Sequence, residues 1–145
     1  MPEKKTIERA KRDKAEGKAT TTQAGEFVRE EMEHIREGKH GARSPQQAIA
    51  IGLSKARRAG VDLPPPRKGT VSETTRQRAE RDLEKGRAGK QTKTSAKRSR
   101  ARREALKREP RSAASKSALS KQAKQAAARR RVRGKTTASE STRTR

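Results

Sequence analysis

The sequence predicts an all-α protein, in which a small N-terminal helical hairpin is followed by a largely disordered, helix-prone basic tail. Three observations support this prediction. Only 26% of the residues are hydrophobic and 40% are charged, a balance typical of chains that are mostly disordered in isolation. The large apolar residues cluster between Phe27 and Leu63 and recur there at helical spacing. Beyond Leu63 such residues are few and widely spaced, so any folded unit is expected to be small and N-terminal.

Residues 1–21 are predicted to form a charged N-terminal helix and a linker. Residues 4–16 are good helix formers that carry charges of both signs, and no apolar stripe runs along them. We therefore expect a frayed, solvated helix that ends near Gly17.

The predicted hairpin core occupies residues 22–63. Apolar residues mark one face of its first helix, and Gly38 fits the left-handed position that follows a helix end. The second helix closes at Gly60, and Gly52 would let the two helices approach closely. We assign the hairpin core to six apolar residues: Phe27, Val28, Met32, Ile35, Ile49 and Leu53.

The start of the second hairpin helix carries the clearest local signal in the chain. Ser44 precedes a proline at the first helical position, and Gln47 follows at the spacing of a capping box. These residues predict a helix that begins at Pro45.

The remaining chain divides into three parts. Residues 64–71 begin with three prolines and are predicted to be a stiff spacer. Residues 72–86 predict a marginal helix that is capped by Ser72 and ended by Gly86. Residues 87–145 are predicted to be a basic tail that is disordered or conditionally helical, because its helix-prone segments lack a sustained apolar face.

The formal net charge is +24, and most of it lies in the second half of the chain. Residues 1–63 carry 14 Lys and Arg against 10 Asp and Glu, whereas residues 64–145 carry 27 against 7. This charge density favours a polyanionic partner, and DNA and RNA are the abundant polyanions of a cell. The predicted nucleic-acid-binding residues are Lys97, Arg98, Arg100, Arg102, Arg103, Lys107, Arg108, Arg129, Arg130, Arg131, Arg133 and Lys135, with Lys55, Arg57 and Arg58 in the hairpin.

We predict non-sequence-specific DNA binding by a nucleoid-associated, histone-like protein of the cytoplasm, with duplex DNA favoured over RNA. The hairpin is expected to support weak self-association. Two alternatives remain open: an RNA- or ribosome-associated basic factor, and an antitoxin-like or plasmid-stabilisation module that contacts another protein. A degenerate helix-turn-helix is less favoured, because such a domain needs a third helix and a fuller core. The longest apolar run, residues 48–53, is too short to cross a membrane.

Catalytic machinery is not recognisable in the sequence. No Gly-rich phosphate loop, Ser/His/Asp set or carboxylate dyad is present, and the chain has no cysteine. His34 and His40 lack the spacing of known metal motifs, so we expect the acidic residues near them to form a solvated face. Those acidic residues are Glu30, Glu31, Glu33 and Glu37. We therefore predict no catalytic residue, no metal, no cofactor and no small-molecule substrate.

Two stretches resemble known proteins. Residues 26–60, with a helix, a Gly-Lys linker and the QAIAIGLSKAR segment from Gln47 to Arg57, resemble a family of small, basic, uncharacterised bacterial proteins. Some relatives carry the labels plasmid stabilisation or DNA binding, and the resemblance implies no catalytic residue. The basic tail is similar in composition to the tails of bacterial histone-H1-like proteins.

Overall fold

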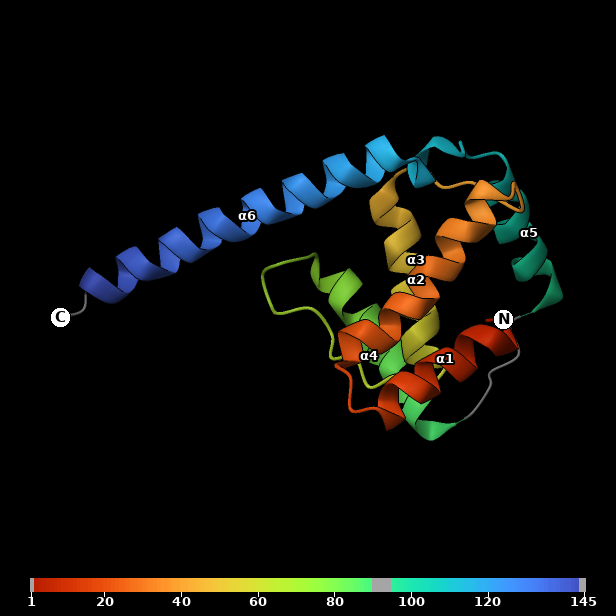
Figure 1. Cartoon of the computed structure of the whole chain (residues 1–145), viewed down its shortest axis with the longest axis horizontal. Coiled ribbons are helices and arrows are strands. Elements are labelled where there is room, and N and C mark those ends of the chain that lie inside the picture. Colours follow the sequence, from red (N-terminus) through yellow and green to blue (C-terminus); the bar gives the residue numbers. More distant parts are fainter. Residues whose placement is uncertain (1, 90–94, 144–145) are drawn as a thin grey trace.

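The computed structural model describes residues 2–89 and 95–143, with side chains described as far as residue 134. Every regular element within these ranges is helical, which confirms the predicted all-α class for this part of the chain. The helices are α1 (Lys4–Ala15), α2 (Thr20–Arg36), α3 (Pro45–Arg58), α4 (Glu73–Ala88), α5 (Ala96–Lys107), the short 3₁₀ helix η1 (Ser112–Ala114) and α6 (Lys116–Arg143) (Figure 1). No described helix is both long and apolar enough to cross a membrane.

Helices α2 and α3 form the predicted pair, and their ends follow the predicted chemistry. The Ser44 hydroxyl accepts the Gln47 N–H at 3.2 Å and so caps α3. The Gln47 side chain accepts the Arg43 N–H, one residue before the cap, so the reciprocal half of the capping box is displaced by one position. Gly38 and Gly60 follow the two helix ends with φ values of +80° and +103°.

Close approach of α2 and α3 depends on Gly52, as predicted. A Cβ atom at this position would lie 2.7 Å from the Cα of Val28 in α2. Phe27 and Ile35 of α2 are fully buried beside the pair, and Met32 is buried as well. The other three predicted core residues are half-buried and pack against the same clusters; they are Val28, Ile49 and Leu53.

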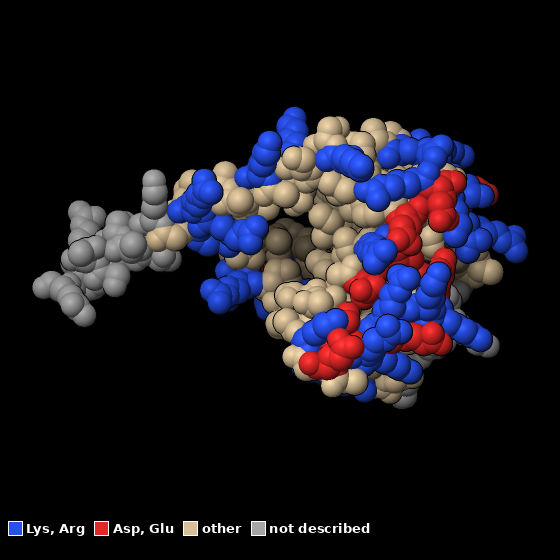
Figure 2. Space-filling model, in the orientation of Figure 1, with Lys and Arg blue, Asp and Glu red and all other residues tan. Residues whose placement is uncertain are grey.

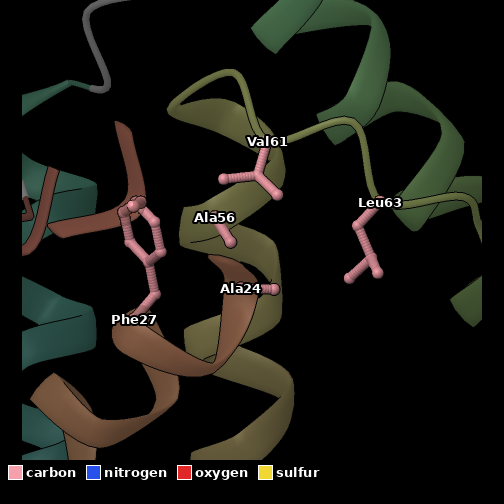
Figure 3. Close-up of a cluster of buried hydrophobic side chains, with 6 residues drawn as sticks. Ala24, Phe27, Ala56, Val61 and Leu63 are labelled. Carbon is pink, nitrogen blue, oxygen red and sulfur yellow. The ribbon is translucent and has the colours of Figure 1, made fainter. Parts of the chain in front are cut away.

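The first hydrophobic cluster joins α1 to this pair. It gathers Ala24 and Phe27 from α2, Ala56 from α3, and Val61 and Leu63 from the segment after α3 (Figure 3). Ala10 of α1 belongs to the same cluster, and Ile7 packs against it.

The expectation of a solvated N-terminal helix is therefore wrong. Thr6, Ala10 and Asp13 of α1 are all buried, and the backbone N–H of Glu3 donates to Glu30 of α2. Short side chains hide this packing from a sequence pattern, because alanine and threonine do not register as an apolar stripe. They still remove surface from water when two helices come close.

Helix α4 packs on α3 and is longer than predicted. Ser72 caps it as predicted, but the left-handed residue that ends it is Gly89, with φ +64°, and not Gly86. Gly86 lies inside the helix, where a Cβ atom would collide with the Arg57 carbonyl oxygen. Its lack of a side chain thus serves helix packing and not helix termination.

The basic tail is not largely disordered, which corrects the second half of the predicted fold. Helices α5 and α6 are formed, and the segment between them packs on α2 and α3. Ala113 and Ala114 of η1 are buried in a second hydrophobic cluster with Met32, Ile35, Ala42 and Ala48, and Leu119 packs against it. The backbone N–H groups of Gly41 and Ala42 also donate to the carbonyls of Leu106 and Pro110, at 2.8 and 3.0 Å. Alanines and main-chain bonds therefore attach the tail, and neither gives a sequence signal.

Arg111 links η1 to the end of α2. Its guanidinium donates to the carbonyl oxygens of Ile35 and Arg36 in the last turn of α2, and the Ile35 carbonyl also accepts the Gly38 N–H. Arg36 reciprocates by donating to the carbonyl of Ala114 at 3.1 Å. The two arginines thus lock the tail segment onto the hairpin from both sides.

Replacing Arg111 with alanine is expected to loosen this attachment locally, by about 1–2 kcal/mol, because its two hydrogen bonds to carbonyls of α2 are lost. Amide hydrogen exchange at Gly41 and Ala42 should then become faster, since their acceptors lie in the released segment. Arg108→Ala is the matched control, because the exposed Arg108 side chain makes no hydrogen bond to a described residue. Equal exchange in the two variants would contradict the role of Arg111.

Candidate nucleic-acid interface

Helix α5 presents cations on all its sides. Ser95 caps the helix by accepting the Arg98 N–H at 3.2 Å. The helix and Arg108, which directly follows it, carry seven exposed side chains from the predicted set, and none of them forms an ion pair with another described residue. They are Lys97, Arg98, Arg100, Arg102, Arg103, Lys107 and Arg108. The helix joins the body at its C-terminal end, where the Leu106 carbonyl accepts the Gly41 N–H.

Helix α6 extends away from the body as a long rod (Figure 1). Ser115 caps it by accepting the Ala118 N–H at 3.2 Å. Among the predicted residues, Arg129, Arg130, Arg131 and Arg133 are exposed on this rod. Lys135 lies on the same helix, in the part whose side chains fall outside the described set.

Three further cations of α6 were missed by sequence reasoning. Lys116, Lys121 and Lys124 are exposed on the first turns of the rod. They stand apart from the dense arginine runs, which is why a search for such runs overlooks them. Continuity of the helix adds them to the same surface.

The charge of this region is not balanced within the protein. Residues 95–134 contain 15 Lys and Arg against two Glu, whereas residues 2–89 contain 21 against 14. The ion pairs that the structure records between described side chains lie between Glu3 and Arg87. Figure 2 shows the same division, with Lys and Arg projecting from both edges of α6 and acidic side chains following α2. The region from α5 to α6 is therefore an exposed cationic surface.

A shallow pocket connects this surface to the body. It lies where α3 and α6 begin, so the positive ends of two helix dipoles face it. Arg43, just before α3, and Lys121 of α6 border the pocket. Its lining is Arg43, Ser44, Pro45, Ser112, Ala113, Ser115, Ser117, Ala118 and Lys121. The positive potential thus continues from α6 onto the start of α3.

The three predicted contacts in the hairpin are engaged inside the protein. Arg57 is only 7% exposed and donates to the carbonyls of Leu63 and Pro64, and burial lowers the pKa of its guanidinium against an opposing effect of Asp82. Lys55 donates to the buried Glu31. Arg58 lies 3.7 Å from Asp82 and is the most exposed of the three. The structure thus separates them from the cations of α5 and α6.

The acidic face expected near the histidines is only partly solvated. Glu33 and Glu37 are exposed and pair with Arg29 and Lys39. Glu30 and Glu31, however, are 3% and 1% exposed, so the expectation is wrong for these two. They point inward because α2 is covered by α1 and α3 on that side.

In comparisons with known proteins, a family model matches the N-terminal part of the chain. The chain matches no curated protein and no solved structure. Helices α5 and α6, with the cations described above, lie beyond the matched residues. The labels plasmid stabilisation and DNA binding are not part of the matched family's description. Residues 4–68, which include α1, α2 and α3, match the model of a family described as a family of unknown function, DUF6496.

Proposed function

We propose that this protein binds duplex DNA without strong sequence preference, through the cations of α5 and α6. The observation that carries the proposal is the unbalanced charge of residues 95–134, displayed on exposed helices. Arginine, which supplies ten of those cations, pairs with phosphate in a bidentate geometry. Neutralising phosphates releases the counterions condensed on DNA, and that release drives association.

The distribution of the cations argues for phosphate contacts and against base reading. They lie on all sides of α5 and α6, so no single face is set apart to enter a groove. The side chains that stack on bases are also missing, because the chain has no Trp or Tyr and its one Phe, Phe27, is buried. A protein of this kind acts as a nucleoid-associated, histone-like protein.

Formed helices shape the way binding would occur. Helix α6 contacts η1 and α3, and the Leu106 carbonyl of α5 accepts the Gly41 N–H, so the cations are already arranged along two attached helices. Because the helices are already formed, binding DNA costs little backbone conformational entropy. A tail that had to fold on binding would pay a larger cost and bind less tightly. The body carries a more balanced charge, so it is expected to hold the two helices in place and to add little to DNA affinity.

The test is a salt titration of the full chain with two duplexes of equal length and unrelated sequence. We expect equal affinities for the two duplexes, and a slope of log K against log[salt] near −7 if about eight phosphates are engaged. Structured RNA is added as a competitor in a second series. A shallow slope, or a strong preference for one duplex, would contradict the proposal, and preferential displacement by RNA would identify an RNA-binding factor instead.

A further inference from the structure

The two histidines of the chain lie in a cluster with three carboxylates. Glu31 and His34 come from α2 and His40 from the loop that follows, and one donor atom of each lies within 4.8 Å of the others. Glu3, Glu30 and His34 form a second triad within the same distance. His34 belongs to both triads, so the cluster joins the start of α1, the middle of α2 and the loop after it.

Buried carboxylate oxygens in this cluster lack hydrogen-bond partners. Glu31 is 1% exposed; its Oε1 accepts from Lys55, and its Oε2 lies 3.1 Å from His40 Nε2 without hydrogen-bond geometry. The Oε1 of Glu30 accepts the Glu3 N–H at 2.7 Å, while its buried Oε2 has no partner among the described residues. An unsatisfied buried oxygen of this kind is costly, and more so when it carries charge.

The cluster has a net negative charge, which favours binding of a cation. Three carboxylates meet two ammonium groups, since Lys55 pairs with Glu31 and Lys39 lies 3.6 Å from Glu3. With neutral imidazoles the cluster keeps a net negative charge, in a protein whose total is +24. A further cation beside Glu31 would therefore give its Oε2 a partner and offset the negative charge.

We propose that Glu31, His34 and His40 bind a divalent transition metal, with zinc the best match to their donor atoms. Two imidazole nitrogens and one carboxylate oxygen suit zinc, whereas magnesium and calcium prefer oxygen ligands. Tetrahedral zinc places its ligand atoms about 3.3 Å apart, so the donors have to draw together from their present separation. His40 makes this adjustment, because it lies in a loop and not on a helix.

Glu3 has a supporting role in the site. Glu3 Oε1 lies 2.9 Å from His34 Nε2 and orients that ring. Carboxylates behind a ligating histidine fix its orientation and strengthen the metal bond. This inference is independent of the proposed DNA binding, because no residue of α5 or α6 takes part.

The site is tested by adding ZnCl₂ to the metal-stripped, untagged full chain. Calorimetry is expected to show one zinc ion per chain, and the melting temperature should rise with zinc concentration. Because the chain has two histidines and both lie in the cluster, its imidazole ¹⁵N resonances report on this site alone. Both should shift on binding, and excess MgCl₂ should not reverse the shift.

Variants separate a built site from general attraction to acidic residues. His34→Gln and His40→Gln are each expected to abolish the one-to-one binding. Glu33→Gln and Glu37→Gln are matched controls on the same part of the chain; both residues are exposed and outside the two triads, and their loss should leave zinc affinity within about twofold, since a single exposed charge contributes little. Unmoved imidazole resonances, or equal weakening by the control variants, would overturn the proposal. The resonances of the unaltered chain decide the matter even if a histidine variant fails to fold.

Discussion

Replacing the seven α5 cations with glutamine is expected to weaken duplex binding about a thousandfold at 0.1 M salt. A duplex lies against one side of a helix, so about four of the seven side chains reach phosphates at once, and the salt slope should become shallower by about 3 to 4. Glutamine keeps the helix, because its helix propensity is close to that of lysine and arginine. The replaced residues are Lys97, Arg98, Arg100, Arg102, Arg103, Lys107 and Arg108. Fluorescence anisotropy over a range of salt concentrations measures both quantities.

A second variant with the same loss of charge provides the control. Seven exposed cations of α1 and α4 that form no ion pair with a described residue are replaced with glutamine in the same way: Lys4, Lys5, Lys11, Arg12, Lys14, Arg78 and Arg81. Its net charge matches that of the α5 variant, so the pair distinguishes position from total charge. Equal losses in the two variants would mean that net charge alone attracts DNA, and α5 would then have no special part in binding.

Replacing Gly52 with alanine is expected to lower the free energy of unfolding by about 1–3 kcal/mol. The added Cβ would lie 2.7 Å from the Val28 Cα and 2.9 Å from the Val28 N, and backbone atoms cannot rotate away as a side chain can. The α2–α3 pair therefore has to separate, which opens both hydrophobic clusters. Chemical denaturation followed by circular dichroism measures the loss.

Gly25→Ala is the matched control for this substitution. Gly25 also lies within a helix, α2, but a Cβ atom there would meet nothing within 4 Å. Alanine should therefore raise the free energy of unfolding, by about 0.5–1 kcal/mol, because it is the better helix former. If Gly52→Ala stabilised the protein as well, α2 and α3 would not pack as closely as described.

Local chemistry made the start of α3 and the ends of α2 and α3 predictable, although Gly86 was wrongly predicted to end α4. The capping by Ser44 and the left-handed Gly38 and Gly60 each depend on residues a few positions apart, and all three occur as predicted. The docking of the tail was not predictable in this way. It depends on Ala113 and Ala114 and on a main-chain bond from Gly41, and such contacts between distant segments leave no periodic pattern.

For the candidate interface too, the sequence identified charged residues but not the long-range contacts that they make. Composition identified the cations of α5 and α6, and the structure places those with described side chains on exposed surfaces. Composition could not show that Arg57 turns inward, because its acceptors are carbonyls of Leu63 and Pro64 that approach only when the chain folds back. Nor could it show that Glu31 is buried, since α1 and α3, which cover α2, come from other parts of the chain.

A core built from alanine changes which substitutions the protein tolerates. Eight of the fourteen buried apolar residues in the described part of the chain are alanine. Substitutions there can remove little side-chain volume, but larger side chains would overpack the core. Alanine scanning, the usual search for structural positions, passes over more than half of this core. A scan with valine or leucine would find it, because overpacking is what these close helix contacts resist. The composition suggests that most substitutions are tolerated, but the buried alanine positions accept only small side chains.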